Sequence, residues 1–154
     1  MQIEKTCCFT GRREIPKERI REIKLSLLIE ITQAIKHGYT NFISGFAEGA
    51  DLFAAEIISD LKPKMKNLTL HGAIPNRARL NTKDKNFQNL IMNCDDITVI
   101  SEKSTPDCYF KRNKFMIENS SLLIAVWDGT ESGGTYNTIE YAKMKPIDIR
   151  VIKI

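Results

Sequence analysis

The sequence predicts an α/β fold in which helices cover both faces of an open parallel sheet. Short apolar runs alternate with segments of helical periodicity along the whole chain, as expected for parallel strands joined by crossover helices. The run Leu122–Trp127 is apolar without a break and has the length of a strand buried on both faces. Because the 154 residues contain no linker, repeat or low-complexity segment, residues 1–154 are predicted to form a single domain.

The first strand is expected at residues 5–9, followed by a donor-rich turn at residues 10–13. A helix begins after Pro16, since apolar residues recur at helical spacing from Ile20 to Ile35. Gly38 supplies the left-handed residue that ends it.

A second strand at residues 41–44 leads into a glycine-bearing turn at residues 45–51. The helix over residues 52–61 places its apolar side chains on one face and ends before a proline. A third strand, at residues 68–74, is expected to stop at Pro75 because proline cannot donate to the ladder.

The middle of the chain is more polar. A loop is predicted at residues 76–83, a helix at 85–93 and a fourth strand at 97–100. A second loop at residues 101–109 precedes a helix at 110–119. This strand and helix continue the alternation.

The last unit runs from the strand Leu122–Trp127 through an Asp-Gly turn into Gly133–Thr135 and a helix, and residues 149–154 form the final strand. A strand, glycine turn and helix in this order direct free backbone N–H groups at an anion. Adjacent glycines also let a ligand approach the backbone closely. The alternative is a plain tight turn between a strand and its crossover helix.

Charge and cysteine content exclude little. The formal net charge of +4 permits a phosphorylated ligand or nucleic acid without requiring either. The four cysteines lack zinc-type spacing, so we interpret them as reduced, mostly buried thiols and expect no metal or cofactor. Cys7 and Cys8 should point to opposite faces of their strand.

Without a membrane-length apolar run or a signal-peptide layout, we expect a cytoplasmic protein with no membrane partner.

Three turns that contain glycine follow predicted strands, at residues 10–13, 44–51 and 128–135. Open parallel sheets bind ligands at the carboxyl ends of their strands, where the strand order reverses. The predicted topology gathers these three turns in space, which favours a binding site over three unrelated turns. The predicted helix at residues 110–119 adds an arginine to the candidates. The candidate ligand-binding residues are Thr10, Gly11, Arg12, Arg13, Ser44, Gly45, Glu48, Asp51, Arg112, Asp128, Gly133, Gly134 and Thr135.

These candidates have different expected roles. Gly133–Thr135 are the best phosphate cradle, and Arg12 and Arg13 either clamp phosphate or are solvated turn residues. Asp51 either caps the second helix or accepts hydrogen bonds from ribose hydroxyls or a base edge. Asp128 either binds a hydroxyl or is a turn residue. No residue is assigned a catalytic role.

Four blocks carry a more specific signal, at residues 7–11, 44–51, 112–116 and 123–135. In this order they resemble the YpsA-like family of the SLOG superfamily, which is named for the DNA-processing protein A and LOG groups. The resemblance covers nearly the whole chain. It implies a Rossmann-like fold and a pocket for a nucleotide or a nucleotide-derived ligand such as ADP-ribose. Members serve variously as nucleotide hydrolases, single-strand DNA binders and ligand-sensing modules.

The chain departs from these relatives at two points. The family usually has His-Arg-Pro after Thr-Gly, where this chain has Arg12-Arg13-Glu14, so a permanent cation replaces a titratable imidazole. The LOG phosphoribohydrolases carry a catalytic glutamate at the position of Thr138. The nearest carboxylate, Glu140, should point about 200° away around the helix.

We therefore predict a module that binds a nucleotide-type ligand, to sense or sequester it, without rapid turnover. The alternatives are an N-glycosidic nucleotide hydrolase and a single-stranded nucleic-acid binder. The missing glutamate disfavours the first, and the modest charge without basic residues among exposed aromatics disfavours the second. A homodimer is expected from the resemblance and from the wide apolar arc of the first helix around Leu27–Ile31.

Overall fold

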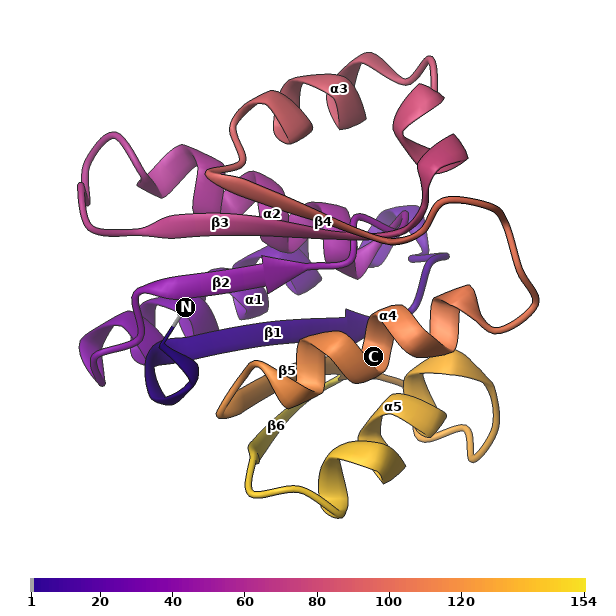
Figure 1. The fold of residues 1–154 in the computed structure, drawn as a ribbon. Coiled ribbons are helices and arrows are strands. Elements are labelled where there is room, and N and C mark those ends of the chain that lie inside the picture. Colours follow the sequence, from indigo (N-terminus) through magenta and orange to yellow (C-terminus); the bar gives the residue numbers. More distant parts are fainter. Residues whose placement is uncertain (1) are drawn as a thin grey trace.

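The computed structural model describes residues 2–154, which form one six-stranded parallel sheet with helices on both faces (Figure 1). The predicted α/β class and Rossmann-like architecture are confirmed. The strands are β1 (Thr6–Gly11), β2 (Asn41–Ser44), β3 (Thr69–Asn76), β4 (Asp96–Ser101), β5 (Leu122–Trp127) and β6 (Asp148–Lys153). The α-helices are α1 (Ile20–Lys36), α2 (Ala50–Leu61), α3 (Lys85–Met92), α4 (Cys108–Glu118) and α5 (Gly133–Lys143). Short 3-10 turns lie at η1 (Ile3–Lys5), η2 (Lys17–Arg19) and η3 (Arg77–Asn81).

The helices form two layers. Helices α1, α2 and α3 cover one face of the sheet, and α4 and α5 cover the other (Figure 1). Each layer has its own apolar cluster. Cys7 belongs to the cluster under α1 and α2, whereas Cys8 belongs to the cluster under α4 and α5, as the alternation along a strand predicted.

The strand order is β4-β3-β2-β1-β5-β6. The chain moves outward from β1 to β4, and α4 then carries it back across the sheet to β5, on the other side of β1 (Figure 1). The order therefore reverses between β1 and β5, whose ends are in register at Gly11 and Val126. A crevice at the carboxyl ends of these two strands is the expected ligand position in such a sheet.

Two boundaries differ from the sequence-based expectation. Strand β3 continues through Pro75 to Asn76, because β2 has already ended opposite Gly72 and this part of β3 pairs with β4 alone. Proline is tolerated on a strand segment with a free side. The predicted loop after β3 contains η3, whose first turn is capped by the Asn76 side chain.

The described residues contain no helix that is both long enough and apolar enough to cross a membrane. All four cysteines are free thiols, and only Cys94 is partly exposed. Burial raises the pKa of Cys8 to about 12, so this thiol stays protonated at neutral pH.

Candidate functional site

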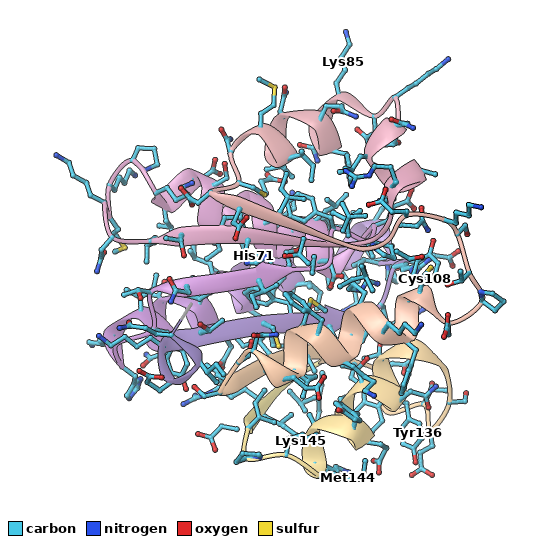
Figure 2. The ribbon with its side chains drawn as sticks, in the orientation of Figure 1. His71, Lys85, Cys108, Tyr136, Met144 and Lys145 are labelled. Carbon is cyan, nitrogen blue, oxygen red and sulfur yellow. The ribbon has the colours of Figure 1, made fainter. Side chains whose placement is uncertain are left out.

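The carboxyl ends of β1, β2, β3 and β5 border a cleft with two joined compartments. Figure 2 shows Cys108 at the start of α4 and Tyr136 in the first turn of α5, at the edge toward which β1 points. The α5 compartment has a volume of about 220 Å³ and lies between β1 and the start of α5. The β3 compartment has a volume of about 200 Å³ and lies beside the end of β3. Both are lined by Arg13, Ala47 and Arg112.

The wall between β1 and α2 is packed too tightly for side chains. A Cβ on Gly11 would lie 2.6 Å from the Ala50 Cβ, and a Cβ on Gly49 would lie 2.3 Å from the Arg12 carbonyl oxygen. The Ala50 N–H donates to that same carbonyl at 3.1 Å. These contacts join the turn after β1 to the start of α2.

The turn after β2 is held by Ser44. Its buried hydroxyl donates to the Asp51 carbonyl at 2.8 Å and accepts from the Phe46 N–H at 3.2 Å. Phe46 has a positive φ of 56°, which is unusual for a residue with a bulky side chain. Its ring is fully buried and packs edge-on against Phe87. Ser44 thus shapes the turn, and its oxygen is already occupied.

Arg112 and Asp51 face each other across Gly45. A Cβ on Gly45 would lie 2.7 Å from Arg112 Nη1 and 2.8 Å from Asp51 Oδ2. Arg112 is only 4% exposed, and its Nη1 donates to the Gly45 carbonyl at 2.6 Å. Its Nε donates to Asn113 Oδ1 at 2.8 Å. The absence of a side chain at Gly45 lets a buried cation and a buried carboxylate approach the same point.

Asp51 is 5% exposed, and its Oδ1 is buried without a hydrogen-bond partner among the described residues. Burial raises the pKa of Asp51 to about 6, although Arg112, the Ala47 N–H and Arg13 each act to lower it. The carboxylate is mostly ionised at neutral pH and has a free acceptor beside the α5 compartment.

Asp51 does not cap helix α2, contrary to one of the two sequence-based interpretations. The helix begins at Ala50 with Gly49 at the N-cap, so Asp51 is already in its first turn. The physical reason is the positive φ of 80° at Gly49, which lets the chain turn into the helix two residues earlier.

The start of α5 is open, in contrast to the wall between β1 and α2. Apart from the neighbouring residues of the same turn, no described atom lies within 4 Å of the Cβ position at Gly133 or Gly134. Ser132, at the N-cap, makes no side-chain cap. The first N–H groups of an α-helix have no partner within the helix, so this end offers donors to a ligand.

Arg12 and Asp128 lie at the rim of the cleft. Their side chains approach at 3.5 Å between Arg12 Nη1 and Asp128 Oδ2, and both are about one-third exposed. Asp128 Oδ1 accepts the Thr130 N–H at 2.9 Å, a bond that lowers the pKa of Asp128. Asp128 is therefore a turn residue that also holds Arg12.

Comparison with known proteins supplies the family. The family model YpsA, described as the YspA SLOG family, matches residues 13–154. The chain belongs to this SLOG family.

Two relatives illustrate the range of sequences that match. The SPbeta prophage-derived protein YoqJ of Bacillus subtilis strain 168 is 30% identical over 141 residues, which cover 79% of this chain and 81% of YoqJ. A UPF0398 protein of Bacillus cereus strain G9842 is 26% identical over 129 residues, which cover 80% of this chain and 70% of that protein.

The fold is also similar to the solved structure of DNA processing protein A from Helicobacter pylori, whose single-stranded DNA binding mode that structure describes. The TM-score is 0.65 at 18% sequence identity, over 95% of this chain. This SLOG chain spans 64% of the length of that protein. At this identity the likeness establishes the shared fold.

The resemblance to the LOG group aligns Thr138 with the catalytic glutamate of those relatives. It is 3% exposed, and its hydroxyl donates to the Gly134 carbonyl at 2.8 Å, within the first turns of α5. Glu140 pairs with Lys143 at 2.9 Å, and neither residue lines the cleft. Thr138 supports the helix start instead of presenting a carboxylate to it.

Most of the predicted site residues line the cleft of this family member, but three do not. The α5 compartment is lined by Thr10, Gly11, Arg12, Arg13, Asp51, Arg112, Gly134 and Thr135, and the β3 compartment adds Gly45 and Glu48. Ser44 lies beneath the turn it braces, and Asp128 and Gly133 lie beside the cleft without lining it.

Sequence reasoning missed Pro75, Arg79 and Tyr109, which complete the β3 compartment. Arg79 Nη2 donates to the Phe46 carbonyl at 2.8 Å, and its guanidinium lies 4.5 Å from the Phe87 ring centroid. Tyr109 is 40% exposed. The only available signal was the cluster of arginines after the third strand. No group of three or more metal-binding side chains occurs within residues 2–154.

Proposed function

We propose that the cleft binds a nucleotide or a nucleotide-derived ligand, to sense or sequester it, without turning it over rapidly. The observation that carries this proposal is the buried Asp51 carboxylate, whose Oδ1 has no hydrogen-bond partner among the described residues and which lines the α5 compartment together with Arg112 and Gly134. Buried polar atoms in native proteins are nearly always hydrogen-bonded, so an orphaned acceptor that borders a cavity indicates a ligand donor.

The α5 compartment has N–H donors and arginines on one side and a carboxylate acceptor on the other. These groups match the phosphate and the ribose hydroxyls of a nucleotide. The phosphate is assigned to the backbone N–H groups of Gly134 and Thr135, with Arg12 and Arg13 beside it. Asp51 would repel a phosphate but accepts hydrogen bonds from ribose hydroxyls. The ligand's phosphate therefore lies toward α5 and its sugar toward α2.

The direct test is thermal stabilisation by a panel of AMP, ADP-ribose and cyclic dinucleotides. A ligand at about 100 times its Kd adds roughly 2.7 kcal/mol to the unfolding free energy. For a domain of this size that corresponds to a melting shift of roughly 5–10 °C. Native mass spectrometry of the purified protein identifies a co-purified ligand. If no member of the panel shifts the melting point and no nucleotide is bound, the proposal is wrong.

Slow turnover is expected because the chain has no carboxylate at the position where the LOG relatives carry their glutamate. Cleaving an N-glycosidic bond requires a carboxylate or an activated water at the developing oxocarbenium centre. Thr138 cannot supply it, Arg112 stays charged, and Glu140 is paired outside the cleft. Incubation with AMP, CMP and ADP-ribose should release less than about one base per minute, far below a median enzyme rate of about 10 s⁻¹. Faster release that Asp51→Asn abolishes would establish a hydrolase.

We also propose a homodimer through α1. Leu25, Leu28 and Ile29 are 57%, 37% and 52% exposed on the outer side of this helix, while Leu27 and Ile31 face the core. An apolar patch of this kind is typical of a symmetric helix contact. Light scattering at micromolar concentration should give twice the monomer mass, and Leu28→Glu should return it to the monomer value.

A further inference from the structure

We infer that the ligand carries two separated phosphate groups, one at the start of α5 and a second in the β3 compartment, held by Arg13, Arg79 and Arg112. This inference rests on the proposed function and extends it to the ligand's chemical class. A nucleoside 3′,5′-bisphosphate, in which a sugar lies between the two phosphates, is a ligand of this class.

The lining of the β3 compartment carries more positive than negative charge, and the Asp51 carboxylate across Gly45 offsets only part of it. Its lining includes three arginines and one carboxylate, Glu48, which is exposed. Within the described chain, no carboxylate oxygen lies within 4.0 Å of a guanidinium nitrogen of the three. The neighbouring Arg77, by contrast, forms a two-pronged pair with Glu102 at 2.7 and 3.0 Å. Converging arginines without a direct salt bridge repel one another, and an anion between them reduces that repulsion.

Each of the three guanidinium groups is held in place by contacts that leave N–H groups unused. Arg79 donates from Nη2 to the Phe46 carbonyl and lies over the Phe87 ring. Arg13 and Arg112 lie 5.1 and 5.7 Å from the centroid of Tyr109. Since a guanidinium has five donors, these contacts position the groups while leaving several donors for phosphate oxygens.

A carboxylate lies where the two compartments meet. Asp51 lines the α5 compartment and faces Arg112 across Gly45, and Arg112 and Gly45 line the β3 compartment. Because a carboxylate at this position repels phosphate, a continuous pyrophosphate does not suit both sites. A sugar between the two phosphates keeps them apart at Asp51 and brings a hydroxyl to its carboxylate.

The test compares three adenine nucleotides by isothermal titration at low salt. AMP supplies one phosphate, whereas ADP and adenosine 3′,5′-bisphosphate supply two each, adjacent or separated. We expect the 3′,5′-bisphosphate to bind at least tenfold more tightly than ADP. Equal affinity of these two would overturn the inference, because charge alone would then explain binding.

The variant Arg79→Gln tests whether the second phosphate lies in the β3 compartment. The variant should lose the tenfold gain of the 3′,5′-bisphosphate while binding AMP like the parent, and Arg79→Lys should retain part of the gain. Arg77→Gln is the matched control from the same 3-10 turn and should change nothing. Unchanged AMP affinity also shows that each variant is folded. Equal weakening of AMP and the bisphosphate by Arg79→Gln would overturn the assignment.

Two further arms separate the remaining outcomes. A 5′-phosphorylated oligothymidylate presents the same spaced phosphates on a nucleic-acid strand, and its affinity should also fall in Arg79→Gln. If Arg79→Gln binds the oligothymidylate as tightly as the parent protein does, the inference is wrong. If AMP, ADP and the bisphosphate all fail to bind, the proposed function itself has failed. If AMP binds but the bisphosphate binds no more tightly than ADP, the inference of two separated phosphates is wrong while the proposed function stands.

Discussion

The cleft has a crowded wall between β1 and α2 and an open wall at the start of α5, and both are built with glycine. A Cβ on Gly49 would lie 2.3 Å from a backbone oxygen, whereas one on Gly134 would have no atom within 4 Å. Glycine at the first wall allows two segments of backbone to pack together. Glycine at the second leaves space in front of free N–H groups.

This difference separates residues that build the site from residues that meet a ligand. Substitutions at the crowded wall should act on folding, because no space exists for new atoms. Substitutions at the open wall should act on binding, because new atoms enter the volume that a ligand would use.

The largest effect is expected from Gly49→Ala. Its methyl group would collide with the Arg12 carbonyl, and its φ of 80° is unfavourable for alanine. We expect a loss of roughly 3–5 kcal/mol in unfolding free energy, measured by urea denaturation. Gly38→Ala is the matched control, since φ is 98° there with no atom within 4 Å, and it should cost only about 1–2 kcal/mol. Equal losses would mean that crowding has no role at Gly49.

The next largest effect concerns the pH dependence of stability through Asp51. Its folded pKa of about 6 lies above the ordinary value of 3.8, so the folded state holds this proton more tightly than the unfolded state does. The contribution of Asp51 to the unfolding free energy is fully present below about pH 4. It is lost as the pH rises toward 6, by about 3 kcal/mol in total. Asp51→Asn should remove this loss, as measured by denaturation from pH 4 to 8. Parallel pH profiles for parent and variant would contradict the burial effect.

A binding effect is expected from Gly134→Asp. The new carboxylate would occupy the open volume before α5 and repel phosphate, so affinity should fall at least about 100-fold, or roughly 2.8 kcal/mol. Stability should change little, because an acidic side chain is favourable near a helix start. Gly129→Asp, in the turn outside both compartments, should keep full affinity. Unchanged binding by Gly134→Asp would show that this turn is only structural.

The smallest effect on stability is expected from Arg12→Gln. Its pair with Asp128 at 3.5 Å is partly solvated, so the unfolding free energy should change by less than about 1 kcal/mol. Affinity for a phosphorylated ligand should nevertheless fall several-fold, and its salt dependence should become shallower. If Arg12→Gln lowers the unfolding free energy but leaves ligand affinity unchanged, the Arg12 side chain supports the fold and does not contact the ligand.

Much of the fold follows from sequence pattern. The apolar run Leu122–Trp127 was predicted as a buried strand and is β5, and residues 41–44 were predicted as the strand that is β2. Periodicity succeeds here because burial along a strand or helix repeats with the geometry of that element. It failed at Pro75, since the tolerance for proline depends on a neighbouring strand that ends early.

The site was only partly predictable. Turns with glycine and charge at strand ends identified Arg12, Arg13 and Asp51, which line the cleft. Arg79 lies in η3 and Tyr109 in the first turn of α4, neither of which has such a signature, and they enter the site because β3 and α4 bring them there. Their places in the site depend on how these elements pack against the sheet, and local spacing in the sequence does not specify that packing.

The sequence alone determined the alternation of strands and helices and the positions of the glycine turns. These properties depend on local backbone preference and on apolar periodicity. Only the tertiary structure decided which glycine is crowded and which is open, and that Asp51 is buried with a free oxygen. Both properties depend on distances between segments far apart in the chain, which the strand order sets. The same residue type therefore serves packing at Gly49 and access at Gly134.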